Sequence, residues 1–257
     1  MRVAVLGLGE AGRIYAAELA EQGIEVTATD PLATSAPPAV TLASDIPAAV
    51  REAEIVLSLV GGGAAASALD TALPAMRPEA LYADLNTLAP DEKRRLAARA
   101  VERGNAFVDV AVLAPVPRAG LRTPLALSGT GTERLRSFLE QLDVPTTDAG
   151  PDAGGAAGLK LLRSVFMKGL AALIFEAVTA AREVGAEEWV TGQIASELGP
   201  DGDALVQRLL EGTPAHAVRR EAEMRDARAF LETLGTAHPM TDGTIAWLQA
   251  LAARRDD

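Results

Sequence analysis

The stretch "RVAVLGLGEAGRIYAAELA", residues 2–20, decides the fold of the N-terminal half. A short apolar run is followed by the pattern G-x-G-x-x-G and then by an Ala-rich segment with helical periodicity. Gly7 permits a tight turn, Gly9 lets the backbone approach a pyrophosphate, and Gly12 lets the helix pack closely on the strand. Helix N-terminal amides can then hold phosphate oxygens. The stretch therefore predicts a strand, a dinucleotide-binding turn and a helix.

Asp30 ends the second predicted strand, about 20 residues after the glycines, as the dinucleotide-binding pattern requires. A carboxylate here can accept hydrogen bonds from both adenosine ribose hydroxyls, and it would repel a 2′-phosphate. No Arg or Lys follows until Arg51, so NAD is favoured over NADP. Alternatively, Asp30 serves only as a turn residue before Pro31, and in that case either cofactor could bind. The cofactor contacts expected in this region are Gly7, Leu8, Gly9, Glu10, Ala11, Gly12 and Asp30.

Strand-like runs alternate with helical segments as far as residue 150: "RVAVLG", "IEVTAT", "EIVLSLV", "LYADLN", "AFVDVAV" and "TPLALSG". This alternation predicts an α/β Rossmann domain over residues 1–150, with a parallel sheet covered on both faces. After Pro151 the strand-like runs stop. Apolar spacing of three and four then predicts an all-α domain over residues 151–257, with helical segments near 153–185, 188–210, 214–235 and 240–254.

Composition excludes several classes of protein. A chain of 257 residues that is 49% hydrophobic can bury a sizeable core, and it has neither an apolar run long enough for a membrane span nor a signal-peptide pattern. We therefore expect a soluble, cytoplasmic protein. The net charge of −11 argues against nucleic acid or anionic membrane as a partner. With no Cys and two His, we expect no disulfide and no metal site.

Two further turns follow predicted strands, at the sheet edge where open α/β sheets bind ligands. The glycines of "SLVGGG" would let Val60 and Gly61 run close to the cofactor, or they form a flexible turn. In "DLNTLAP", Asn86 and Thr87 are candidates either for cofactor contact or for capping the following helix. The sequence leaves both alternatives open.

The segment "GLKLLRSVFMKG", residues 158–169, places Lys160, Arg163, Ser164 and Lys168 on one side of an otherwise apolar helix. These side chains either form a solvated face or converge on a ligand. The spacing by itself does not separate the two.

The ordered set of GLGEAG, Asp30, SLVGG, DLNTLAP, the loop beginning at Asp109 and a lysine-bearing helix resembles the β-hydroxyacid dehydrogenase and 6-phosphogluconate dehydrogenase superfamily. The resemblance covers about two-thirds of the chain. It implies a Rossmann domain, a helical domain, a cleft between them that holds the active site, and a homodimer. In such enzymes a lysine near the start of the first long interdomain helix acts as acid and base, and Lys160 stands at the matching position.

Resemblance also assigns roles to the neighbours of Lys160. Its ammonium would protonate a forming alkoxide, and its neutral amine would accept the alcohol proton in the reverse direction. Ser164 stands where family members commonly have Asn, and its hydroxyl can still donate a hydrogen bond to the substrate. Lys168 is a candidate anchor for a substrate anion. Arg163 is expected at the helix surface or in a salt bridge.

The stretch "DVAVLAPVPRAGLRTPLALSG" departs from the family. Where relatives typically carry a Ser-Gly-Gly turn that holds the substrate carboxylate, this chain has Ala-Pro-Val-Pro, which removes amide donors. The loop and the short helical half resemble a less-studied branch whose C-terminal domain is of unknown function. Arg122 is either an anion ligand or solvent-facing, and so is Arg118. The substrate contacts expected from the loop are Val112, Ala114, Pro115 and Arg118.

Together, these features predict an NAD-dependent oxidoreductase, acting as a homodimer on a small, anionic hydroxy or carbonyl compound. One alternative is an imine reductase-like enzyme, which uses the same architecture on C=N bonds. Another is a non-catalytic sensor that binds NAD without turnover.

Overall fold

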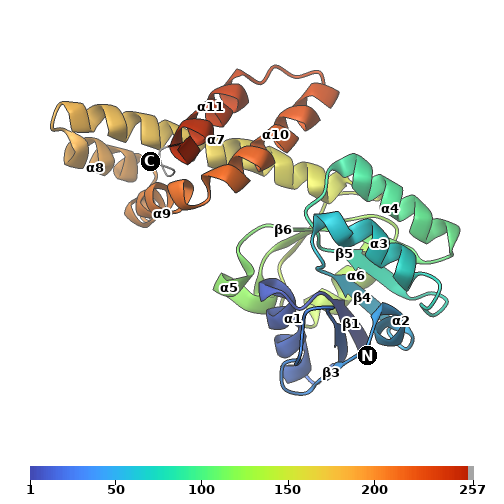
Figure 1. Cartoon of the computed structure of the whole chain (residues 1–257). Coiled ribbons are helices and arrows are strands. Elements are labelled where there is room, and N and C mark those ends of the chain that lie inside the picture. Colours follow the sequence, from blue (N-terminus) through green and yellow to red (C-terminus); the bar gives the residue numbers. More distant parts are fainter. Residues whose placement is uncertain (254–257) are drawn as a thin grey trace. The chain divides into compact units, whose positions relative to one another are not determined.

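The computed structural model describes residues 1–253 and divides the chain into two compact units, Met1–Lys160 and Leu161–Asp257 (Figure 1). The division falls inside one long helix, α7 (Gly155–Glu183). The strand-like sequence ends near residue 150, but the first turn of α7 still belongs to the first unit. Lys160 is therefore the last residue of the first unit.

The first unit contains an eight-stranded sheet in the order β3-β2-β1-β4-β5-β6-β7-β8. All six predicted strands are present, and two three-residue strands, β3 and β8, add the sheet's outer edges. The strands are β1 (Arg2–Leu6), β2 (Glu25–Thr29), β3 (Val40–Leu42), β4 (Ile55–Ser58), β5 (Leu81–Asp84), β6 (Ala106–Val112), β7 (Leu125–Ser128) and β8 (Thr146–Asp148).

Strand β7 runs antiparallel to β6, whereas every other neighbouring pair is parallel. The predicted parallel Rossmann sheet is thus present, with β7 as its one antiparallel strand. The connection from β6 holds only the four-residue helix α5 (Val116–Ala119) and a 3₁₀ turn (Gly120–Arg122). Neither is long enough to carry the chain back across the sheet, so β7 starts at the carboxyl end of β6. The Ala-Pro-Val-Pro loop consequently lies at the edge where ligands bind in such sheets.

Helices cover both faces of this sheet, as the buried, apolar strands require. Helices α1 (Glu10–Glu21) and α6 (Thr132–Glu140) pack on one face. Helices α2 (Ile46–Val50), α3 (Gly62–Ala72) and α4 (Pro90–Glu102) pack on the other. The largest wholly buried apolar side chains include Tyr15 and Leu19 from α1, Leu69 from α3, and Tyr82 and Phe107 from the sheet.

The second unit consists of helices, as predicted. After α7 come α8 (Glu187–Glu197), α9 (Gly202–Ala215), α10 (Ala217–Thr233) and α11 (Pro239–Ala253). The predicted segment 188–210 is two helices, because Gly199 takes a positive φ and the chain turns back tightly. A Cβ on Gly202 would lie 1.9 Å from the carbonyl oxygen of Ala195, so α8 and α9 meet backbone to backbone.

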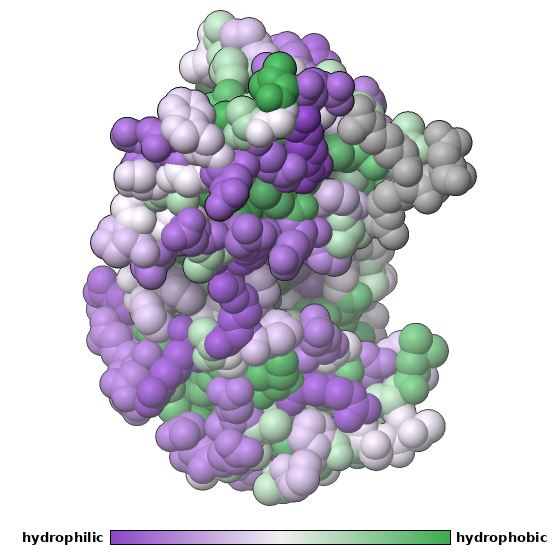
Figure 2. Space-filling model, turned by 90° about the vertical axis from the view of Figure 1, so that its left-hand side faces the viewer, coloured by the Kyte–Doolittle hydropathy of each residue, from purple (hydrophilic) through white to green (hydrophobic). Residues whose placement is uncertain are grey.

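Across residues 1–253, no helix is both long and apolar enough to cross a membrane. On the face drawn in Figure 2, hydrophobic residues lie in separate groups among hydrophilic ones.

Candidate functional site

The glycine turn between β1 and α1 leaves no room for side chains at two of its three glycines. Gly7 has a φ of +93°, and a Cβ there would lie 2.5 Å from the carbonyl oxygen of Leu59. A Cβ on Gly12 would lie 2.0 Å from the carbonyl oxygen of Gly7. Gly9, in contrast, has no neighbour within 4 Å of its Cβ position and precedes α1 without a side-chain cap. The N-terminus of α1 thus opens onto space that an anion can occupy.

Asp30, at the end of β2, is tied to this turn. Its Oδ2 accepts a hydrogen bond from the backbone N–H of Leu8 at 2.7 Å, and its Oδ1 accepts one from Leu32 at 2.8 Å. A carboxylate oxygen has two lone pairs, so each can accept a second bond, as contact with a ribose would require. Asp30 therefore fixes the glycine turn and keeps acceptors for a ligand.

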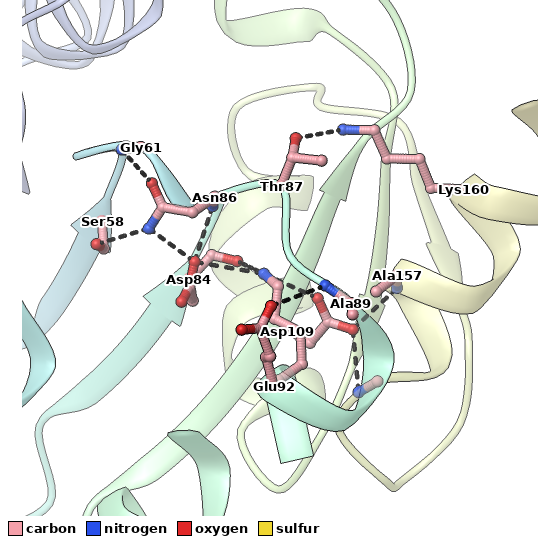
Figure 3. A network of polar contacts seen from close by, with 12 residues as sticks. Ser58, Gly61, Asp84, Asn86, Thr87, Ala89, Glu92, Asp109, Ala157 and Lys160 are labelled. Atoms are coloured by element: carbon pink, nitrogen blue, oxygen red, sulfur yellow. Dashed lines mark hydrogen bonds and ion pairs between the residues drawn. The ribbon is translucent and has the colours of Figure 1, made fainter. Parts of the chain in front are cut away.

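Asn86 joins the turns after β4 and β5 (Figure 3). Its Oδ1 accepts from the N–H of Gly61 at 2.7 Å, and its Nδ2 donates to Asp84 Oδ1 at 2.8 Å and to Ser58 Oγ at 3.0 Å. Helix α4 starts only after Ala89, so of the two alternatives left open for Asn86 and Thr87, capping of this helix is not found. The amide instead sets the conformation of the turn that contains Val60 and Gly61.

Thr87 meets Lys160 across the carboxyl edge of the sheet. The Nζ of Lys160 donates to Thr87 Oγ1 at 3.1 Å, although the two residues are 73 positions apart (Figure 3). Lys160 lies in the second turn of α7 and is partly exposed. The structure thus brings together two of the side chains that the sequence singled out.

The start of α7 is held by side chains that sequence reasoning missed. Asp109 is fully buried in β6, and its Oδ2 accepts from the N–H of Gly154 at 3.1 Å and of Ala157 at 2.9 Å. Ser128 donates its Oγ–H to the same oxygen and accepts from the N–H of Ala156 at 2.9 Å. A carboxylate at a helix N-terminus stabilises it. The carboxylate within the buried run "AFVDVAV" was the signal for this arrangement.

Lys93 is a further residue that was not singled out from the sequence. It lies on the buried stripe of α4 and is 1% exposed. Its Nζ donates to the carbonyl oxygen of Asp84 at 2.8 Å, and it is 3.3 Å from Asp84 Oδ1 and 3.1 Å from Asp109 Oδ1. A buried charge needs partners, and here one ammonium has two carboxylates. A lysine in line with Pro90, Leu96 and Ala100 was the available signal.

The expected substrate loop contributes no buried cation. Val112 ends β6, Ala114 and Pro115 follow it, and Arg118 in α5 is exposed. Arg122 forms an ion pair with Asp143 at 3.2 Å, in which both side chains are largely exposed. The sequence left Arg122 either as an anion ligand or as a solvent-facing residue, and the structure has it facing solvent.

Ser164 and Lys168 belong to the second unit and contact each other. The Nζ of Lys168 donates to Ser164 Oγ at 2.9 Å and lies 2.9 Å from Glu223 Oε2 on α10. Burial lowers the pKa of Lys168, while the carboxylate of Glu223 acts in the opposite direction. Lys168 therefore already has an anionic partner inside the helical unit.

Among the described residues, no group of three or more His, Asp or Glu side chains could hold a metal ion. The chemistry available at the carboxyl edge is that of an amine, hydroxyls, an amide and backbone N–H groups.

Comparison with family models gives two matches. The NAD binding domain of 6-phosphogluconate dehydrogenase matches residues 2–142, and the Domain of unknown function (DUF1932) matches residues 181–251. Both the superfamily resemblance and the resemblance to a branch with an uncharacterised C-terminal domain are confirmed.

Solved structures share the fold over nearly the whole chain. A conserved protein of unknown function, described as structurally similar to 3-hydroxyacid dehydrogenases, is 27% identical, with coverage of 99% of this chain and 98% of that chain and a TM-score of 0.78. The Mycobacterium tuberculosis 3-hydroxyisobutyrate dehydrogenase, solved with L-serine, is 22% identical, with coverage of 98% and 94% and a TM-score of 0.83. A variant imine reductase from Myxococcus stipitatus in complex with NAD⁺ is 19% identical, with coverage of 98% and 94% and a TM-score of 0.70.

Proposed function

The chain belongs to the family of the NAD binding domain of 6-phosphogluconate dehydrogenase, and we propose that it is an NAD-dependent oxidoreductase for a small, anionic hydroxy or carbonyl compound. The observation that carries this proposal is the contact between Lys160 and Thr87 at the carboxyl edge of the sheet. In sheets of this kind, ligands bind outside the carboxyl ends of the strands. An amine at that edge is suited to proton transfer with a substrate oxygen.

The glycine turn fits a dinucleotide. Gly9 is open, the N-terminus of α1 lacks a side-chain cap, and Asp30 retains acceptors beside the turn. We assign the cofactor contacts to residues 7–12, Asp30, Val60, Gly61, Asn86 and Thr87. The charge of Asp30 disfavours a 2′-phosphate, so NAD is the proposed cofactor and NADP the weaker one. When bound, NAD supplies the hydride acceptor and its reduced form the donor.

Lys160 is the proposed general acid and base. Its ammonium would donate a proton to the substrate oxygen in the reducing direction, and its neutral amine would take that proton in the oxidising direction. The Thr87 hydroxyl orients the amine by accepting its hydrogen bond. The roles proposed for Ser164 and Lys168, and for Val112, Ala114, Pro115 and Arg118 in the loop, rest on the family resemblance.

We also propose a homodimer. Within the second unit, α7 exposes Leu162, Phe166 and Leu173 at helical spacing, and Phe166 is 67% exposed. A continuous apolar stripe on a long helix favours association, and a symmetric pair of identical helices can bury it. Sedimentation of the wild type against Phe166→Glu tests this arrangement, with a shift to monomer expected in the variant.

The experiment that tests the activity follows absorbance at 340 nm. Purified protein is incubated with NAD or NADP and either 3-hydroxyisobutyrate or L-serine, since the similar dehydrogenase was solved with L-serine. We expect reduction of NAD in preference to NADP with at least one small hydroxy acid. Tight NAD binding without turnover of hydroxy acids or imines would instead support the non-catalytic sensor.

The imine reductase structures give a second candidate, because they share the fold over 98% of this chain. In the same assay, NADH is incubated with cyclohexanone and allylamine, the carbonyl and amine present in a reductive aminase structure of the same fold. Oxidation of NADH that requires both compounds would favour C=N reduction. Oxidation with the ketone alone would favour the dehydrogenase.

A further inference from the structure

Lysine is scarce in this chain, and each one lies in a polar cluster. Of 24 basic residues other than His, only Lys93, Lys160 and Lys168 are lysines. Lys160 is the proposed acid and base, and Lys168 pairs with Glu223. Lys93 has no part in the proposed chemistry, yet it is the most deeply buried of the three. Such a buried charge is costly to maintain and calls for a physical reason.

On one side, Lys93 contacts the carboxylate that organises the turn after β5. Asp84 Oδ1 accepts hydrogen bonds from both the backbone N–H and the Nδ2 of Asn86, each at 2.8 Å. Asn86 in turn accepts from Gly61. Asp84 therefore sets the turns that contain the proposed cofactor contacts and Thr87.

On the other side, Lys93 contacts the carboxylate that holds the start of α7. Asp109 accepts from Gly154 and Ala157 through Oδ2, and its Oδ1 faces the Nζ of Lys93 at 3.1 Å. Lys160 follows Ala157 by less than one helical turn. The position of the Lys160 backbone thus depends on Asp109.

The two carboxylates are direct neighbours, because Asp84 and Asp109 are register partners on β5 and β6. Both are 0% exposed, so their repulsion is poorly screened by water. The ammonium of Lys93 is within 3.3 Å of a carboxylate oxygen of each, so it attracts both. Without it, the two carboxylates would move apart, carrying the β5 turn and the start of α7 with them.

We propose that Lys93 is a positioning residue for the oxidoreductase reaction, which fixes Thr87 and Lys160 relative to each other by bridging Asp84 and Asp109. This inference rests on the proposed function for its catalytic consequence. The claim that Lys93 holds the start of α7 through Asp109 rests only on the contacts of these residues.

The experiment compares three variants with the wild type. Lys93→Met keeps the length of the side chain and removes its charge. Lys93→Met combined with Asp84→Asn also removes one carboxylate, which restores the charge balance, and Asn can still accept the bonds from Asn86. Arg95→Met is the matched control, because Arg95 is exposed on the same helix.

The readouts are amide hydrogen exchange in residues 153–159 and steady-state kinetics with NAD and 3-hydroxyisobutyrate. In Lys93→Met we expect exchange about tenfold faster or more, since these amides lose a fixed acceptor. We expect kcat to fall on the order of 10- to 100-fold, because reacting groups are misplaced, with KM values within about threefold. The double variant should regain protection and kcat relative to Lys93→Met, while Arg95→Met behaves like the wild type.

A double variant that is worse than Lys93→Met, in folding, exchange or kcat, would overturn the proposal, because Lys93 would then act through packing. Unchanged exchange and kcat in Lys93→Met would overturn it equally. If Lys93→Met does not fold, restoration of folding by the double variant supports the charge-balancing role. A wild type without turnover contradicts the proposed function, and exchange in the two variants then decides whether Lys93 holds the start of α7.

Discussion

Lys93 and Lys168 both form ion pairs, one in the nucleotide unit and one in the helical unit, but their surroundings differ. Lys93 and its two carboxylates are almost completely inaccessible to water. The side chain of Lys168 is 13% exposed, and that of its partner Glu223 is 33% exposed. The first cluster joins β5, β6 and α4, whereas the second joins two helices. Lys93 is thus inaccessible to water and paired with two carboxylates, whereas Lys168 is partly solvated and paired with one carboxylate.

Lys160 differs from both in that it is partly exposed and donates a hydrogen bond to a neutral hydroxyl, that of Thr87. The three lysines thus have three different environments, and substitutions at each should have effects of different size.

The largest effect on stability is expected at Lys93. Lys93→Met should destabilise the nucleotide unit by about 3–5 kcal/mol, because it leaves two buried carboxylates uncompensated. Both tryptophans, Trp189 and Trp247, lie in the second unit, so far-UV circular dichroism during urea unfolding is the suitable probe. A loss below about 1 kcal/mol would mean that the cluster behaves like a surface ion pair.

The next effect concerns Asp30 and the cofactor. Asp30→Ala removes the proposed acceptor of the ribose hydroxyls as well as the partner of the Leu8 amide, so NAD affinity should fall by about 1.5–3 kcal/mol. Affinity for NADP should fall less, because repulsion of the 2′-phosphate disappears. Titration of both cofactors by calorimetry measures the difference. An equal loss for NAD and NADP would show that Asp30 acts only on the turn.

The glycine turn provides a matched pair of substitutions. Gly12→Ala should cost about 1–3 kcal/mol of stability, because its Cβ meets the Gly7 carbonyl oxygen. Gly9→Ala has open space and should leave stability nearly unchanged while weakening NAD binding. Thermal unfolding with and without NAD separates the two effects. Equal destabilisation by both substitutions would contradict the assigned geometry.

The smallest effect is expected at Lys168. Lys168→Met should change stability by less than about 1 kcal/mol, because the pair is partly solvated. The folded-state pKa of Lys168 lies below the ordinary 10.5, so the unfolded chain binds more protons in the interval between them. Wild-type stability should therefore rise relative to the variant as pH increases through that interval. Tryptophan fluorescence in urea at several pH values reports on this unit, and an opposite slope would contradict the direction of the shift.

Much of the fold could be predicted from local patterns. The glycine spacing, Asp30 and the six apolar runs depend on residues close in sequence, and the structure has these elements. The direction of β7 was not predicted, because it depends on how far the connection 113–124 can reach. Capping and cofactor contact were both open for Asn86, but its partners Gly61 and Ser58 belong to β4 and the turn after it, which local patterns could not indicate.

The buried cluster illustrates the same limit. Asp84, Lys93 and Asp109 lie on three different elements, β5, α4 and β6, and each looks unremarkable in its own segment. Only strand register places the two carboxylates side by side, and only the packing of α4 brings the ammonium between them. Lys93 on an apolar stripe was a visible signal of a buried charge, but its partners could not be read from the sequence.

The role of Lys160 is tested most directly by the rate of NADH formation at 340 nm, compared between wild type and Lys160→Met with saturating NAD and a hydroxy acid that the wild type oxidises. We expect kcat to fall on the order of 10²- to 10⁴-fold in the variant, the usual contribution of a general acid or base. NAD affinity and stability should be unchanged, because the contact of Lys160 with Thr87 is partly exposed. A Lys160→Met variant with wild-type kcat would contradict the central claim.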